Sequence, residues 1–124
     1  MTNTVKVKTA NLDGIALDWV VAKCEGHHWR MGDRYPQYAP EETSCWMTWR
    51  VSSDWAQAGP IIERERIDVF SIANGKGWCA QSDVRVFNGY GPTPLISAMR
   101  CYLASRLGDE VEIPKELTWH QNLL

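Results

Sequence analysis

The chain is 124 residues long, an ordinary size for a single domain, and 44% hydrophobic with 23% charged residues is typical of globular proteins. We therefore expect one domain over residues 1–124. The 13 Lys and Arg are outnumbered by 15 Asp and Glu, so the net charge of −2 argues against nucleic acid as a partner. The apolar runs are too short to span a membrane, and residues 1–8 lack the apolar segment of a signal peptide. We expect a cytoplasmic protein.

The cysteines are widely spaced and form no CxxC pair, so we expect free, buried thiols: Cys24, Cys45, Cys79 and Cys101. A zinc site at Cys24, His27 and His28 would lack the second pair of ligands that structural zinc usually has. The sequence therefore predicts neither a metal nor a cofactor.

The first half of the chain predicts one strand and one helix before a loop. Residues 5–9 alternate apolar and polar side chains, as in a half-buried edge strand. Apolar residues recur at helical spacing over 13–25, with Asp13 as the cap and Gly26 as the stop. Residues 27–43 are rich in Gly, Pro, Tyr and charge, which predicts a long surface loop.

The middle of the chain predicts strands separated by turns. Alternation over 45–51 indicates a strand, and 52–59 is polar enough to be a turn region. A further strand is expected over 67–72. Asn74-Gly75 favours a hairpin, because both residues tolerate the positive φ of a type I′ turn, and the returning strand would contain residues 78–80. An extension over 84–87 is also expected.

A second helix is predicted over 94–107. Residues 88–92 are expected to form a turn before it, Thr93 to cap it and Gly108 to end it. The segment after residue 114 is expected to be loose apart from one short turn. The predicted fold class is α+β, with two helices packed on one face of a mostly antiparallel sheet.

Three segments together carry a resemblance to a known family. They are Leu12–Lys23, Ser53–Glu65 and Gly91–Tyr102, and 108–111 follows the third. In this order and spacing they resemble the NinX-like proteins of lambdoid phages, over about residues 5–117. The resemblance implies a phage accessory protein acting in the host cell cytoplasm, and it implies no reaction, since the family has no known function.

The segment Asp54-Trp55-x-Gln57 is the first candidate for ligand binding. Trp55 offers a flat face for stacking on a nucleobase, Gln57 an amide that can read a base edge, and Asp54 an acceptor for a ribose hydroxyl. The alternative is structural, with Trp55 closing the end of the core and Asp54 capping a turn. The sequence leaves both interpretations open.

The start of the second helix is the second candidate. Unpaired backbone N–H groups near Thr93 favour an anion, and Arg100, about two turns into the helix, is the charge expected to neutralise a phosphate. A capped helix after a tight turn explains the same residues without a ligand. We expect this turn to lie close to the Trp55 segment, with Trp78 as a neighbour and Glu63 as a weaker contact to a ribose or amine.

The leading hypothesis is a phage protein that sequesters a small nucleotide-type ligand without turnover, as anti-defence sponge proteins do; that step is an analogy between gene contexts. One alternative is a protein–protein inhibitor of a host enzyme, for which the abundant Trp and Tyr would be anchors. The other is a weak nucleotide hydrolase acting through Glu63 or Glu65. As partners we expect the ligand, or a host protein, and other copies of the chain in a homo-oligomer.

Overall fold

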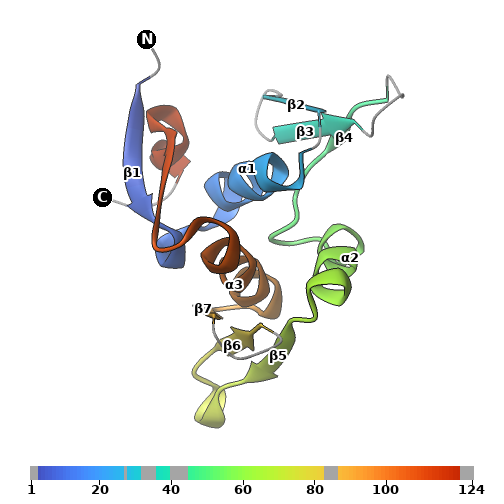
Figure 1. The fold of residues 1–124 in the computed structure, drawn as a ribbon, viewed down its shortest axis with the longest axis vertical. Helices are drawn as coiled ribbons and strands as arrows, with labels where there is room; N and C mark the ends of the chain where they lie inside the picture. The colour runs from blue at the N-terminus through green and yellow to red at the C-terminus, as the bar shows by residue number, and fades with distance from the viewer. Residues whose placement is uncertain (1–2, 27, 32–35, 40–44, 83–86, 121–124) are drawn as a thin grey trace.

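A computed structural model describes residues 3–26, 28–31, 36–39, 45–82 and 87–120 (Figure 1). This part of the chain contains three helices and three small antiparallel sheets, so the predicted α+β class is confirmed. The helices are α1 (Gly14–Glu25), α2 (Trp55–Glu65) and α3 (Pro94–Leu107). None of them is both long and apolar enough to cross a membrane.

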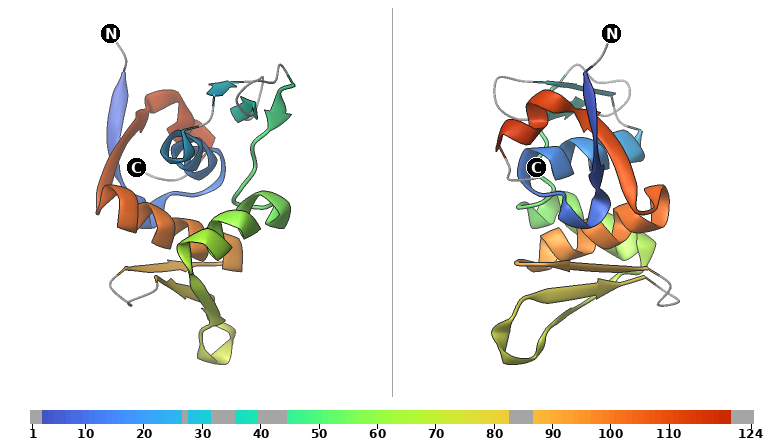
Figure 2. Two further views of the ribbon diagram at one scale, coloured as in Figure 1. Left: turned by 45° about the vertical axis from the view of Figure 1, so that its right-hand side comes forward. Right: turned by 90° about the vertical axis from the view of Figure 1, so that its left-hand side faces the viewer.

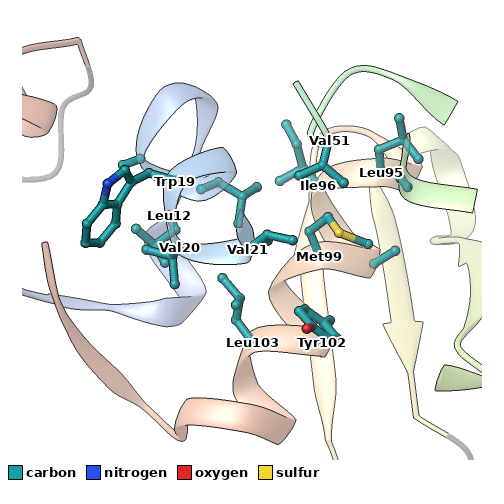
Figure 3. Packing of buried hydrophobic residues seen from close by; sticks show 14 of the residues in the cluster. Leu12, Trp19, Val20, Val21, Val51, Leu95, Ile96, Met99, Tyr102 and Leu103 are labelled. Atoms are coloured by element: carbon teal, nitrogen blue, oxygen red, sulfur yellow. The ribbon is translucent and has the colours of Figure 1, made fainter. Parts of the chain in front are cut away.

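Helix α3 is the centre of the molecule. A sheet of β5 (Asp68–Ser71), β6 (Trp78–Gln81) and β7 (Asn88–Gly91) packs on one side of it, and α1 packs on the other (Figure 2). Both helices are buried over much of their length, and Figure 3 shows Val21 of α1 facing Met99 of α3. The expected pair of helices on one sheet face is not confirmed, because α1 packs on the side of α3 that faces away from this sheet.

Gly89 of β7 lets α3 lie unusually close to its sheet. A Cβ at this position would lie 2.2 Å from the backbone oxygen of Ser97 and 2.4 Å from the backbone nitrogen of Cys101. The expected turn over 88–92 is therefore wrong: residues 88–91 form a strand, whose glycines serve close packing.

A second sheet joins segments from near the two ends of the sequence. Strand β1 (Thr4–Lys8) pairs with β8 (Glu110–Pro114) in the register Lys8↔Glu110 to Thr4↔Pro114. Short 3-10 segments follow both strands, at Thr9–Asn11 and Lys115–His120. The strand near the start of the chain is confirmed. The short turn expected after residue 114 is a 3-10 segment that extends to His120, and the rest of the segment expected to be loose, 121–124, lies outside the described residues.

The third sheet contains β2 (His28–Met31), β3 (Pro36–Ala39) and β4 (Met47–Thr48). The predicted loop over 27–43 thus includes two strands, and the predicted strand over 45–51 is shorter than expected. Aromatic contacts hold this sheet to the core: Trp29 packs edge-on against Trp19 with centroids 5.3 Å apart, and Tyr38 packs on Trp49 at 4.7 Å.

The predicted ends of two helices are confirmed. The Asp13 carboxylate accepts a hydrogen bond from the backbone N–H of Gly14 at 2.7 Å, and Gly26 ends α1 in a left-handed conformation. Thr93 caps α3 and Gly108 follows its last residue. The hairpin between β5 and β6 is also confirmed, with Asn74 at φ 68°. The predicted extension over 84–87 lies mostly outside the described residues.

The polar turn predicted over 52–59 is wrong, because helix α2 begins at Trp55. Asp54 caps it, and the helix continues through Gly59 and Pro60. Proline removes one N–H from the helix ladder, so the carbonyl of Ala56 loses its partner. Pro60 and Ala56 are both exposed, so water can bond that carbonyl and the helix tolerates the break.

The three helices are tied together at Glu25. Its carboxylate accepts hydrogen bonds from both terminal nitrogens of Arg64, at 2.9 and 2.7 Å, and from the hydroxyl of Tyr102. Arg64 lies on α2 and Tyr102 on α3, so one carboxylate on α1 connects all three. Burial is the largest cause raising the pKa of Tyr102, and the Glu25 contact raises it further.

Removing the Tyr102 hydroxyl tests this connection. Tyr102 is 1% exposed, so Tyr102→Phe should lower the free energy of unfolding by about 1.5–3 kcal/mol, the cost of losing a hydrogen bond to a charged group. Urea unfolding measures the change. Tyr90→Phe, at an aromatic that is 58% exposed, is the matched control and should be neutral. Equal effects of the two substitutions would contradict the assignment.

Candidate functional site

Trp55 is a prominently exposed side chain at a depression of the surface. It is the first residue of α2 and is 58% exposed. With Arg50, Ser53 and Asp54 it lines a shallow hollow of about 350 Å³. The alternative in which Trp55 closes the core is therefore wrong: its indole faces solvent.

The backbone leading to Trp55 is held by Gln57. Its side-chain nitrogen donates to the carbonyl of Thr48 at 2.8 Å, and its side-chain oxygen accepts from the N–H of Arg50 at 2.7 Å. The amide thus uses both ends to attach the segment after β4 to the first turn of α2. This engagement is the physical reason why Gln57 is unsuited to read a base edge as predicted; it positions its neighbours instead.

A buried carboxylate also anchors the turn that precedes Trp55. Asp18 of α1 is 3% exposed and accepts a hydrogen bond from the N–H of Ser52 at 2.8 Å. Burial raises its pKa to about 6, although the bonds from Ser52 oppose that shift. Val51, one residue earlier, is fully buried and lies beside Ile96 of α3 (Figure 3). The turn before Trp55 is therefore anchored to the core.

Asp54 caps the start of α2. Its side chain accepts from the N–H of Ala56 at 2.9 Å, and its carbonyl accepts from Gln57 and Ala58. A carboxylate has two oxygens, each with two acceptor positions, so the cap leaves acceptor capacity at this half-buried side chain. Asp54 can cap the helix and still accept a hydroxyl from a ligand.

The other predicted site residues lie elsewhere or are engaged in structure. The hydroxyl of Thr93 accepts from the N–H of Ile96 at 3.2 Å as the cap of α3. Arg100 donates to the carbonyls of Leu12 and Tyr90 and lines a different depression from Trp55. The composite site of one stacking ring and Arg100 is thus divided between two hollows.

Trp78 and the two glutamates also take up other positions. Trp78 is half-buried on the sheet face turned to α3, since its register partner Gly91 packs on Ile96 of that helix. Glu63 is exposed on α2. Glu65 pairs with Arg64 and Arg106, and the hydrogen bond from Arg64 is the main cause lowering its pKa. On a helix, a spacing of two points Glu63 and Glu65 to different sides.

Sequence reasoning missed Arg50, Ser53 and Asp18. Arg50 and Ser53 belonged to segments expected to be strand and turn, so nothing marked them as neighbours of Trp55. Asp18 had a signal: it lies among the buried residues Leu17, Trp19 and Val20 within one helix. A carboxylate in such a run requires a partner.

The cysteines and the potential metal ligands bear on two further expectations. The four cysteines are free, but Cys45 is exposed and Cys24 only half-buried, so the expectation that all are buried is wrong. Among the described residues, no three His, Cys, Asp or Glu side chains lie close enough to share a metal ion. His27, part of the zinc alternative, lies outside those residues.

Comparison with known proteins gives a match to a family model over most of the chain. The family model described as "Bacteriophage P22, NinX" matches residues 8–106. No curated protein matches the chain. The matched range contains all three segments that carry the resemblance, as well as α1, α2 and most of α3. This chain belongs to the bacteriophage P22 NinX family.

Proposed function

We propose that this NinX-family protein binds a small nucleotide-type ligand at Trp55 and holds it without turnover. The observation that carries the proposal is a tryptophan 58% exposed on a backbone fixed by Gln57 and Asp18. Leaving an indole in water forgoes part of the roughly 1.5–3 kcal/mol that burying a large apolar side chain contributes. A stacked base would recover that burial at little ordering cost, because the platform is already rigid.

The neighbours of Trp55 supply the remaining contacts of such a ligand. The guanidinium of Arg50 is suited to a phosphate, the hydroxyl of Ser53 to a phosphate or sugar oxygen, and Asp54 to a ribose hydroxyl. These groups surround the hollow from one short stretch of chain. We infer that the ligand stacks its base on Trp55 and directs its phosphate toward Arg50.

Binding without turnover is favoured because Asp18, Asp54 and Glu65 are buried or already engaged in hydrogen bonds and ion pairs. Asp54 serves as a helix cap, and Glu65 is held ionised by its two arginine partners. Asp18 has a raised pKa, but it is buried and bonded to Ser52. Asp54 and Glu65 are engaged in structural contacts and Asp18 is buried, so none of the three is an exposed, unengaged carboxyl of the kind that general acid or base work at the hollow requires. In a phage protein, retention of a host signalling nucleotide would lower its free concentration and blunt a defence response.

Trp55→Ala tests the proposal. Mass spectrometry of material released by heating, after incubation with lysate of infected cells, identifies the nucleotide, and isothermal titration measures its affinity. Loss of stacking should weaken binding about 5- to 150-fold, the equivalent of 1–3 kcal/mol, while thermal stability stays near wild type because the side chain is exposed. Phe70→Ala, at an aromatic 43% exposed on β5, is the matched control and should bind normally.

Other results would redirect the assignment. Normal nucleotide affinity in Trp55→Ala would refute the site, and an altered nucleotide in the released material would indicate an enzyme.

Met47 favours the second candidate function, a protein-binding surface. It is 45% exposed and precedes Thr48, which Gln57 ties to α2. Loss of a co-purifying host protein in both Met47→Ala and Trp55→Ala, with no nucleotide released, would support that inhibitor.

A further inference from the structure

A second depression lies where β1 ends against the side of α3. Its volume is about 260 Å³, and it shares no lining residue with the hollow at Trp55. Four side chains give it a polar lining: Lys8, Asn88, Arg100 and Asp109. Thr9 fixes its wall, because its N–H donates to the carbonyl of Asp109 at 2.9 Å and its hydroxyl to the carbonyl of Gly108 at 2.8 Å. The groove is therefore framed by bonded backbone.

Arg100 is the central group of this groove. Its Nε donates to the carbonyl of Leu12 at 2.8 Å, and one terminal nitrogen donates to the carbonyl of Tyr90 at 2.7 Å. Both acceptors are neutral, and within the described part of the chain no carboxylate forms an ion pair with Arg100. A guanidinium has five N–H donors, so these two bonds fix its orientation without exhausting it. The result is an oriented, half-buried positive charge.

Small residues leave space in front of this charge. Ala104 follows Arg100 by one helical turn and therefore lies on the same side of α3. Ala10 lines the groove from the 3-10 segment after β1. Lys8, exposed at the end of β1, contributes a second cation, against the single carboxylate of Asp109. The lining thus carries one net positive charge in a protein whose overall charge is −2.

We propose that this groove binds a phosphate-type oxyanion, held by Arg100 and Lys8, either as free phosphate or as the terminal phosphate of a metabolite. A fixed guanidinium recognises a tetrahedral oxyanion through two parallel N–H bonds, and Lys8 adds a mobile ammonium. The inference is independent of the proposed ligand at Trp55, since the two hollows have no residue in common.

Burial gives the anion an energetic reason to bind. Desolvation lowers the pKa of Arg100, which means that the fold disfavours the charged form relative to water. Asp13 partly offsets this through its charge. A bound oxyanion would supply the close counter-charge that the two carbonyls do not provide.

Titration of the whole protein with inorganic phosphate at constant ionic strength tests the site, by calorimetry and by thermal shift. Lys8→Ala should weaken binding about 3- to 10-fold, and Arg100→Gln more than about 10-fold, because charge-assisted bonds are lost. Asp109→Asn should tighten binding about 2- to 5-fold, since an opposing charge is removed. This gain cannot arise from misfolding. Lys76→Ala and Asp68→Asn make the same charge changes on exposed residues outside the groove and should leave the affinity unchanged.

Two further measurements distinguish free phosphate from a phosphate ester and separate this groove from the hollow at Trp55. Glycerol phosphate binding more tightly than inorganic phosphate would identify a phosphate ester as the ligand, and the reverse would identify free phosphate. Trp55→Ala should retain phosphate affinity, whichever way the nucleotide experiment ends. The proposal is overturned if Lys8→Ala and Asp109→Asn match their controls, or if acetate or chloride produces the same response as phosphate.

Discussion

Replacing Gly89 by alanine is expected to destabilise the protein by about 3 kcal/mol or more, the upper range for overpacking a core. The added methyl would lie 2.2 Å from the backbone oxygen of Ser97 and 2.4 Å from the backbone nitrogen of Cys101. Both atoms belong to the α3 backbone, so a side-chain rotation cannot relieve the contact. The helix would have to move away from its sheet, and the packing on both sides of it would loosen.

Gly59→Ala is the matched control for Gly89→Ala. Gly59 lies within α2, and a Cβ there would meet nothing within 4 Å. Alanine in place of glycine within a helix should stabilise it by about 0.5–1 kcal/mol. The same substitution is thus expected to have opposite signs at the two positions. Denaturant unfolding measures both, and a neutral Gly89→Ala would contradict the close packing of α3 on β7.

Asp18→Asn should remove a large part of the pH dependence of stability. Burial raises the pKa of Asp18 from its ordinary value of 3.8 to about 6, so the folded state holds its proton more tightly than the unfolded state. The contribution is therefore fully present below about pH 4 and is lost as the pH rises through 6. With two pKa units at 1.36 kcal/mol each, the free energy of unfolding should fall by up to about 3 kcal/mol.

Asparagine is a fair replacement because its side-chain oxygen can still accept from Ser52, as the Asp18 carboxylate does at 2.8 Å. The variant should match the wild type near pH 4 and exceed it at pH 7. Urea unfolding at several pH values provides the measurement. Parallel pH profiles for the two proteins would show that Asp18 does not titrate as assigned.

Local signals sufficed for part of the fold. Asp13 and Gly26 enclose α1, Thr93 and Gly108 enclose α3, and Asn74 marks the hairpin, because each acts on backbone within a few residues of itself. Such caps and turns are independent of the rest of the chain. The sequence therefore predicts these elements with nearly correct ends.

The segments that were predicted wrongly depend on distant partners. Trp29 and Tyr38 form strands because they pack on Trp19 and Trp49, contacts that a local pattern of Gly, Pro and charge conceals. Gly89 was expected to be part of a turn. The structure shows instead that a glycine is needed there because the α3 backbone lies too close for a side chain. Propensity yields to tertiary packing at these positions.

The candidate site was predictable only in part. Asp54 and Trp55 drew attention because a turn does not require a tryptophan, but their sequence does not state whether the ring is buried. Exposure is settled by Val51 and Asp18, which hold the preceding turn in the core and leave Trp55 outside it. Arg50 joins the site through the same turn.

The pairing of β1 with β8 imposes an order on the folding of the protein during its synthesis. Thr9 bonds Gly108, 99 residues further along the chain, and the two strands continue from that point. During translation, β1 emerges long before its partner has been synthesised, while the neighbouring strands β5, β6 and β7 can pair with each other as they appear. The unit around α3 is complete before the terminal sheet can close. The groove between Lys8 and Asp109 therefore forms late in folding. A ligand of that groove cannot assist the earlier steps.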